Sequence, residues 1–283
     1  MLADSPVEQP LKPYLTIRPS SGWAALNVGQ IWQFRDLLAT LASRDVKLRY
    51  RQTALGVIWV ILQPLLAAGI FSFVFGRVAK LPSDGIPYFV FSYAGLLGWN
   101  AFSSTLGKVS GCLIGNSALI SKVFFPRLVL PLSTIGSTII DFFVALGMMA
   151  VLMIAYHVYP GVGIVLLPVW LLLLIMLAMG FGLFAAALMV SYRDVQYILP
   201  VVTQFLLYAS PIAYALSAVP ARLRGVYMLN PLSGLLEAFR WSLLGRGEVG
   251  LGYLSYSAVF SLLVFVSGSF AFKRMERRFA DVI

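Results

Sequence analysis

The chain has 283 residues, of which 60% are hydrophobic and 11% are charged, and its mean hydropathy is +0.87. Soluble domains carry about 45–50% apolar and about 25% charged residues, so this composition excludes an ordinary soluble protein and predicts an integral membrane protein. The formal net charge is +10. In a membrane protein such basic residues flank the spans on the cytoplasmic side, so we expect membrane lipids, and no nucleic acid, as partners.

The N-terminal part of the chain divides into a tail and a helix. Residues 1–30 are polar and rich in proline, which predicts a cytoplasmic tail with little structure of its own. In residues 31–51 apolar side chains recur at helical spacing, while the basic side chains lie mostly off that stripe. This pattern predicts an amphipathic helix along the membrane surface. A packing helix of a small soluble domain is less favoured, because no other soluble segment is long enough to cover it.

Residues 52–283 predict the membrane domain. A spanning helix needs about 20 apolar residues, and six stretches meet this requirement. The second is the weakest, because Gly95, Gly98 and Asn100 interrupt it. The predicted fold class is therefore an all-α integral membrane protein with six transmembrane helices, at about 54–75, 88–106, 128–156, 163–190, 197–216 and 254–272.

The basic residues predict the orientation of these spans. With the N-terminus in the cytoplasm, the cytoplasmic flanks hold most of the lysines and arginines, including Arg44, Lys122, Arg127 and Lys273. By the positive-inside rule both termini are then cytoplasmic. The predicted location is the bacterial cytoplasmic (inner) membrane, crossed several times.

Three segments between the predicted spans are expected to be ordered. Residues 116–126, "NSALISKVFFP", and residues 191–197, "SYRDVQY", lie on the cytoplasmic side. On the outer side, Asn230 can cap a helix whose first residue is Pro231. That helix is short and amphipathic, with Glu237 and Arg240 placed to pair on its polar side. We expect short re-entrant or gate helices here, between spans five and six.

The sequence lacks the residues that catalysis or metal binding requires. Cys112 is the single cysteine and His157 the single histidine, so a disulfide and a multi-cysteine metal site are excluded. Gly107 and Lys108 do not complete the phosphate loop G-x-x-x-x-G-K-[ST], because position 102 is Phe and position 109 is Val. We therefore expect no catalytic residue, no metal site and no cofactor bound by this chain.

Asp141 is the one acidic residue deep inside a predicted span. An intramembrane ionisable group is a functional candidate by default, and an ion-coupled transporter would need one. No Glu, Lys or His partner within the spans is visible in the sequence. The favoured interpretation is therefore structural, with the carboxylate paired to a neighbouring hydroxyl or backbone group.

Aromatic residues gather in two regions, the first two spans and the outer end. The membrane-interface belt of Trp and Tyr explains many of them. Alternatively, their rings line a pore and stack on sugars. The sequence leaves both interpretations open for Trp59, Tyr88, Tyr93, Trp99, Phe102, Tyr208, Tyr214, Phe239 and Trp241.

Four blocks of sequence carry a family resemblance. They are "RDVKLRYRQTALGVIWVILQPLL", "GNSALISKVFFPRLVLP", "SYRDVQYILP" and "NPLSGLLEAFR". In order and spacing they resemble the membrane (permease) subunit of type-two ABC exporters, in the subgroup that exports O-antigen and related cell-surface polysaccharides. The resemblance covers roughly residues 30–280.

This resemblance implies a function and a set of contacts. Two copies of the chain would form a homodimer and bind two copies of a separate ATPase, which holds ATP and Mg. The dimer would form the channel for a lipid-linked glycan, and residues 211–244 its outer gate. Three segments would meet the ATPase: the helix at 34–50, the coupling helix at 116–127 and a second contact at 193–194. The contact residues would be Arg44, Lys47, Arg49, Asn116, Ser117, Lys122, Phe124, Phe125, Arg127, Arg193 and Asp194.

Three alternatives remain. An exporter of another cargo, such as a capsule glycan, a teichoic acid or a drug, would have the same fold. An ion-coupled secondary transporter would work without an ATPase and would lose transport on Asp141→Asn. A membrane enzyme acting on polyprenyl phosphate would need clustered acids or a His–Asp set, and none is visible.

Overall fold

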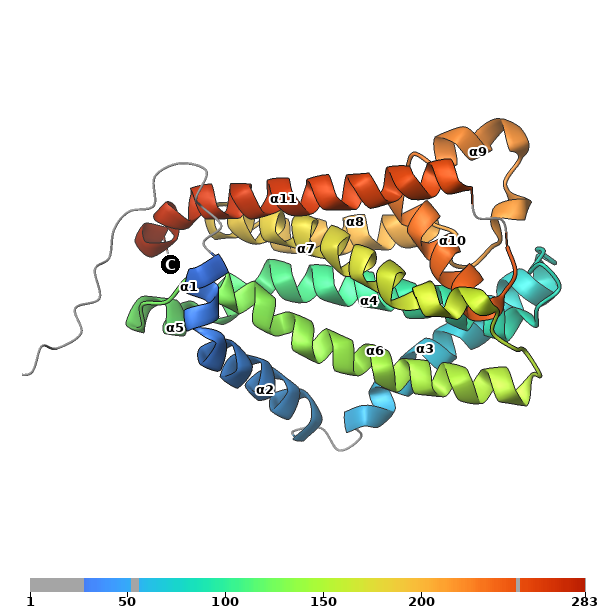
Figure 1. The fold of residues 1–283 in the computed structure, drawn as a ribbon, viewed down its shortest axis with the longest axis horizontal. Coiled ribbons are helices and arrows are strands. Elements are labelled where there is room, and N and C mark those ends of the chain that lie inside the picture. Colours follow the sequence, from blue (N-terminus) through green and yellow to red (C-terminus); the bar gives the residue numbers. More distant parts are fainter. Residues whose placement is uncertain (1–27, 52–55, 248–249, 283) are drawn as a thin grey trace, which may run out of the picture.

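The computed structural model describes residues 28–51, 56–247 and 250–282, and all regular elements within them are helical. The predicted tail at residues 1–30 thus lies almost entirely outside the described residues. The long helices lie side by side along the long axis of the molecule (Figure 1). The α-helices are α1 Val28–Gln33, α2 Arg35–Arg51, α3 Gly56–Phe71, α4 Tyr88–Gly115, α5 Ser117–Lys122, α6 Val129–Ala155, α7 Leu167–Ser191, α8 Val195–Tyr208, α9 Ala221–Tyr227, α10 Pro231–Leu244 and α11 Leu251–Val282.

Four stretches are long and apolar enough to cross a membrane. They coincide with the predicted first, third, fourth and sixth spans, so the prediction of a multi-pass helical membrane protein is confirmed at this level. Short irregular helices extend two of them, a π-helix after α3 and a 3-10 helix before α7. The four stretches are Val57–Val78, Val129–Ala155, Val162–Ser191 and Leu251–Glu276.

Helix α4, at the predicted second span, lies in the middle of the bundle and packs against α3, α6, α7 and α10. It is 28 residues long and extends nine residues beyond the predicted end at 106. A Cβ atom at Gly95 would lie 2.8 Å from the carbonyl oxygen of Ile212. The glycines that weaken its hydropathy therefore let other segments approach its backbone closely.

Helix α8 is shorter than the predicted fifth span at 197–216. It ends at Tyr208 after 14 residues, which corresponds to about 21 Å at 1.5 Å per residue. Beyond it, Ser210 precedes Pro211, and a residue before proline is disfavoured in the helical conformation. The apolar run continues past this point, but the helix does not.

The predicted amphipathic helix at 31–51 forms two helices, α1 and α2, which meet at Phe34. Helix α2 packs along α6, and Leu41 on its apolar stripe is buried in the same core cluster as Val129 of α6. The contact is close, because a Cβ atom at Gly136 would lie 3.3 Å from the Cβ of Ala42. Part of the apolar stripe of α2 is therefore covered by protein.

At the opposite end, Asn230 caps α10 as predicted, because its side chain accepts a hydrogen bond from the backbone N–H of Leu232. The ion pair between Glu237 and Arg240 is also present. Its predicted place on a polar face is wrong, since the two side chains are only 4% and 2% exposed. Helix α10 is inserted among α4, α7 and α11, so this pair lies in the core.

Buried Arg240 has three kinds of partner. Its guanidinium pairs with Glu237, lies 4.1 Å from the centroid of the Phe91 ring, and donates a hydrogen bond to the carbonyl oxygen of Pro211 at 2.8 Å. The arginine thus joins α10 to α4 and to the segment that follows α8. A buried cation is tolerated when its charge and its donors are both satisfied in this way.

We predict that Arg240→Ala destabilises the protein by about 3–5 kcal/mol, because it leaves Glu237 buried without its cation. The measurement is chemical unfolding of the purified protein in detergent. Arg246→Ala, at an exposed position near the same end, is the matched control and should change stability by less than about 0.5 kcal/mol. Equal effects of the two substitutions would contradict the importance of the buried pair.

Candidate functional site

The segments predicted to meet an ATPase gather at one end of the molecule. At the end of the molecule where α11 finishes lie α1, α5, the start of α2 and the turn between α7 and α8 (Figure 1). Helices α9 and α10 lie toward the other end. We call the first end the docking end and the second the outer end.

A polar contact joins the two main segments of the docking end. Nη2 of Arg44 in α2 donates hydrogen bonds to Oδ1 of Asp45 at 2.9 Å and to Oδ1 of Asn116 at 2.8 Å. Asn116 in turn donates to the carbonyl oxygen of Cys112, near the end of α4. Arg44 and Asn116, both predicted as ATPase contacts, therefore hold α2 against the start of α5.

The two adjacent phenylalanines after α5 have different environments. Phe124 is 60% exposed, whereas Phe125 is 2% exposed and belongs to the core. The guanidinium of Arg127 lies 5.2 Å from the centroid of the Phe125 ring. Phe125 was predicted to contact the partner, but in this structure it anchors the segment, and Phe124 is the aromatic side chain that faces outward.

The end of α11 holds the same segment from the other side. Oε1 of Glu276 accepts a hydrogen bond from the backbone N–H of Arg127 at 3.1 Å, and its other oxygen lies 2.6 Å from Nζ of Lys273. Sequence reasoning missed Glu276, because its partner is 149 residues away along the chain. The spacing of Lys273 and Glu276 was the only available signal.

The remaining predicted contacts at this end are accessible. Arg193 and Asp194 are exposed in the turn between α7 and α8, Lys122 is exposed on α5 and Lys47 on α2. Ser117, the first residue of α5, is half-buried. Charged groups and exposed aromatic rings, among them Phe124, Trp32 and Tyr192, thus share this end of the molecule.

Arg49, also predicted to contact the ATPase, pairs with Asp141. Its Nη2 lies 3.2 Å from Oδ2 of Asp141, and Nζ of Lys108 lies 3.1 Å from the same oxygen. The Tyr50 hydroxyl donates to Oδ1 at 2.6 Å. The predicted pairing with a hydroxyl is present. The sequence showed no lysine partner within the predicted spans, but Lys108 reaches Asp141 from outside them. Lys108 lies on the part of α4 beyond the predicted span.

This cluster is largely shielded from solvent. The side chains of Asp141 and Lys108 are 12% and 22% exposed. Burial, and secondly the hydrogen bond to Asp141, raise the pKa of Tyr50, so its phenol stays protonated and remains a donor at neutral pH. Lys108 also donates to the hydroxyls of Ser137 and Thr138. One carboxylate therefore links α2, α4 and α6.

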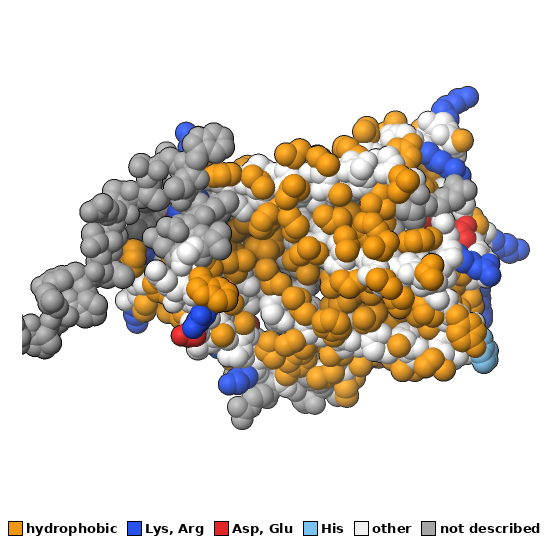
Figure 2. Space-filling model, viewed as in Figure 1, with side chains coloured by type: hydrophobic (Ala, Val, Ile, Leu, Met, Phe, Trp, Pro, Cys, Tyr) orange, Lys and Arg blue, Asp and Glu red, His pale blue; other side chains and the backbone are white. Residues whose placement is uncertain are grey.

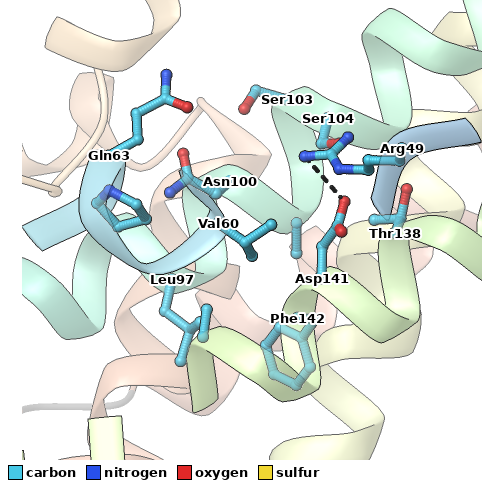
Figure 3. Close-up of a pocket in the computed structure, with 13 residues that line it drawn as sticks. Arg49, Val60, Gln63, Leu97, Asn100, Ser103, Ser104, Thr138, Asp141 and Phe142 are labelled. Carbon is cyan, nitrogen blue, oxygen red and sulfur yellow. Dashed lines mark ion pairs between the residues drawn. The ribbon is translucent and has the colours of Figure 1, made fainter. Parts of the chain in front are cut away.

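A cavity of about 290 Å³ lies beside Asp141. Figure 3 shows Arg49 and Asp141 pointing toward each other, with Gln63, Asn100, Ser103 and Ser104 on one side and Leu97 and Phe142 on the other. Helices α3, α4 and α6 and the end of α2 contribute the lining. The cavity is therefore polar on one side and apolar on the other.

The aromatic residues considered as channel lining fall into two groups. Tyr93, Trp99, Phe102 and Phe239 are buried within this chain, which leaves them little surface to offer a glycan. Tyr88, whose hydroxyl donates to the carbonyl oxygen of Ala213, is half-buried, as are Tyr214 and Trp241. The most accessible members of the set are Trp59 at 49% and Tyr208 at 58% exposure.

Comparison with known families gives the context for this geometry. The family model described as "ABC-2 type transporter" matches residues 36–244, which include α5 and all of α2 except its first residue. The chain belongs to the ABC-2 type transporter family. Permease subunits of this family lack an ATP site of their own, in agreement with the incomplete phosphate loop at Gly107 and Lys108.

Relatives of this ABC-2 permease include transporters of polysaccharides. The O-antigen export system permease protein RfbA of Myxococcus xanthus is 30% identical over 258 residues, which cover 90% of this chain and 98% of that protein. An RfbA of Klebsiella pneumoniae is 27% identical, covering 91% of this chain and 97% of that protein. The polysialic acid transport protein KpsM of Escherichia coli is 27% identical over 243 residues, covering 82% of this chain and 91% of that protein.

We predict that Asp141 fixes the position of α2 in this permease. The Cβ positions of residues 42 and 136 are 3.3 Å apart, close to the 3.5–4.5 Å usual across a disulfide. With Cys112→Ala as background, Ala42→Cys with Gly136→Cys should cross-link on oxidation. Adding Asp141→Asn should lower the yield at least about twofold, because α2 loses its ion pair to α6. A maleimide mobility shift measures the uncross-linked thiols.

Asp36→Asn is the matched control for this experiment. Asp36 also lies on α2, but its side chain is 97% exposed and its recorded ion pair is with the adjacent Arg35. The cross-linking yield should therefore not change. The same yield with Asp141→Asn as with Asp36→Asn would contradict the role assigned to Asp141.

Proposed function

We propose that this chain is the membrane subunit of an ATP-driven exporter for a lipid-linked polysaccharide of the O-antigen type. A separate ATPase subunit binds ATP and Mg and hydrolyses the nucleotide. Two copies of the chain form the channel and bind two copies of the ATPase. The assembly lies in the bacterial inner membrane, with the docking end and both termini in the cytoplasm.

The observation that carries this proposal is the composition of the docking end. Arg44 and Asn116 connect α2 to α5, and Phe124 extends outward from the segment that Phe125 anchors. Lys122, two residues before Phe124, is exposed too. An exposed aromatic side chain is a typical anchor for a protein partner. The family match and the incomplete phosphate loop support a motor on another polypeptide.

The path of the chain supports six spans. The chain runs back and forth between the docking end and the outer end, along α3, α4, α6, α7, α8 and α11 in turn (Figure 1). At 28 residues, α4 is long enough to cross although it is less apolar than the others, because its neighbours cover most of it. Helix α8 completes its crossing together with the non-helical segment after Tyr208. An even number of crossings leaves α2 and the end of α11 on the same side.

A capsule-type glycan is the second candidate cargo, because the relatives include a polysialic acid transport protein. The O-antigen export permeases match a larger share of this chain, which favours O-antigen. An ion-coupled transporter is less favoured. Both oxygens of Asp141 are already engaged by Tyr50, Lys108 and Arg49, so the carboxylate is poorly placed to carry a coupling ion.

We predict that Phe124→Ala weakens ATPase binding about tenfold, the typical loss for an aromatic anchor of an interface. The tagged chain is co-expressed with a candidate ABC ATPase subunit from the same organism, extracted in mild detergent and purified. The co-purified ATPase and its hydrolysis rate are then measured. Phe143→Ala is the matched control, because Phe143 on α6 is also 60% exposed but lies away from the docking end.

Two results would overturn the proposal. One is a chain that purifies without any ATPase and still moves its cargo in the absence of ATP. The other is equal ATPase binding by the Phe124→Ala and Phe143→Ala variants, which would remove the docking end from the interface.

A further inference from the structure

Helix α9, at the outer end, exposes several large apolar side chains. Leu223, Val226 and Leu229 are 54%, 68% and 64% exposed. No residue of α9 itself is buried, although backbone hydrogen bonds continue its turn as far as Leu229. The helix lies at the margin of the bundle, beside the start of α11 (Figure 1). Apolar side chains gathered at one exposed place are typical of an interaction surface.

The opposite face of α9 is held against the protein. Nε of Arg224 donates a hydrogen bond to the carbonyl oxygen of Val219 at 3.1 Å, and the Tyr227 hydroxyl donates to the hydroxyl of Tyr214 at 3.0 Å. Since an α-helix has about 3.6 residues per turn, the exposed residues 222 and 226 lie on the side of α9 away from these contacts. The helix therefore presents apolar side chains together with one arginine to its surroundings.

A hydrogen bond places the end of this segment at the level of the membrane surface. The Tyr256 hydroxyl donates to the carbonyl oxygen of Leu229 at 3.0 Å. Tyr256 is the sixth residue of the membrane stretch Leu251–Glu276, so it lies about 7.5 Å inside that stretch at about 1.5 Å per residue. Helices that lie in the interface bury their apolar face by about 5–10 Å. The depth of Leu229 agrees with this range.

The charges at the outer end favour an anionic surface. Figure 2 shows lysine and arginine side chains at this end. Glu237 is already paired with Arg240, and Asp84 accepts a hydrogen bond from Ser217. Glu248 lies outside the described residues. Five cations at this end are exposed or half-buried and form no ion pair with a described residue: Arg77, Lys80, Arg222, Arg224 and Arg246. Such an excess of positive charge attracts anionic lipid head groups.

We propose that α9 lies on the membrane surface and binds the head groups of anionic phospholipids. Leu223, Val226 and Leu229 enter the apolar boundary of the bilayer. The aliphatic part of Arg222 lies along this boundary and brings its guanidinium to a lipid phosphate. A second copy of the chain is a less suitable partner for this face, because it carries the same excess of positive charge and like charges repel. Because the segment continues into the cap of α10 at Asn230, bound lipid holds the outer helices at the membrane surface.

The test measures which lipid surrounds α9 in the full-length chain. With Cys112→Ala as background, Val226→Cys carries a bimane fluorophore, and the protein is placed in nanodiscs of equal parts phosphatidylcholine and phosphatidylglycerol. A trace of doxyl-labelled phosphatidylglycerol, or the same amount of doxyl-labelled phosphatidylcholine, serves as quencher. We expect both lipids to quench the bimane. The phosphatidylglycerol should quench at least about fivefold more strongly, the factor that corresponds to one cation at an anionic surface.

Substitutions of Arg222 test the source of this preference. Arg222→Gln should lower the quenching ratio of the two lipids by about fivefold, because it removes one cation from the surface. Arg222→Lys keeps the charge and should keep the ratio. Arg35→Gln is the matched control, because Arg35 is also an exposed arginine, at 62%, but lies on α2 near the docking end. The ratio should not change in this variant.

Three other results would overturn the proposal. One is equal quenching by the two lipids, or a preference that Arg222→Gln leaves unchanged. Another is quenching by water-soluble acrylamide without quenching by either lipid, because α9 would then face water. The third is no quenching by lipid or acrylamide, because a second copy of the chain would then cover α9. The assay contains no ATPase and no glycan, so its result is independent of the proposed function.

Discussion

The Asp141 carboxylate is the point on which the arrangement of α2, α4 and α6 depends. It joins the last turn of α2 to α4 and α6 through Arg49, Tyr50 and Lys108. Two cations close to an apolar bundle require a counter-charge, since an uncompensated buried charge costs several kcal/mol. The apolar stripe of α2 alone could slide along α6, but a charge cluster fixes its register. This register also sets the position of Arg44 on α2. Arg44 donates a hydrogen bond to Asn116, which precedes α5, so the position of α5 depends on it too.

The outer end relies on a second buried charge. Arg240 and Glu237 lie inside the bundle, and the arginine reaches the carbonyl oxygen of Pro211. Asn230 donates to the carbonyl oxygen of Ala209 and to Ser210, so the segment after α8 is held at several points. Between the two ends the helices are in contact mainly through apolar and small residues. A Cβ at Gly268 would overlap the backbone of Gly180, which is how α11 and α7 approach so closely.

The sequence was sufficient to predict features that depend on local patterns. The apolar spans at α3, α6, α7 and α11 follow from hydropathy, and the cap of α10 follows from Asn230 and Pro231. The end of α8 could also have been inferred, because Ser210-Pro211 disfavours a continuing helix. Hydropathy alone does not predict this helix end, since the apolar run continues beyond the helix.

Features that depend on long-range pairing could not be read from the sequence. The partners of Asp141 lie 33 and 91 residues away, and no spacing rule connects them. The burial of Arg240 had no local signal either, because an amphipathic helix pattern predicts a solvated charge on its polar face. Phe124 and Phe125 are chemically identical neighbours, and only the fold decides which one faces outward. The order of the spans was sufficient to predict that α2, α5 and the turn at 193–194 lie at one end. It did not predict the contacts among them.

One continuous helix touches both ends of the molecule. Helix α11 is 32 residues long, about 48 Å at 1.5 Å per residue. At the docking end Glu276 holds the backbone of Arg127, and at the outer end the Tyr256 hydroxyl donates to the carbonyl oxygen of Leu229, next to the cap of α10. The close contact of Gly268 with Gly180 lies between them. Because a densely packed interior transmits strain, a displacement of the segment after α5 must be accommodated either in the Glu276 contact or beside α10. The fold therefore connects the segment after α5 mechanically to α10 through one helix.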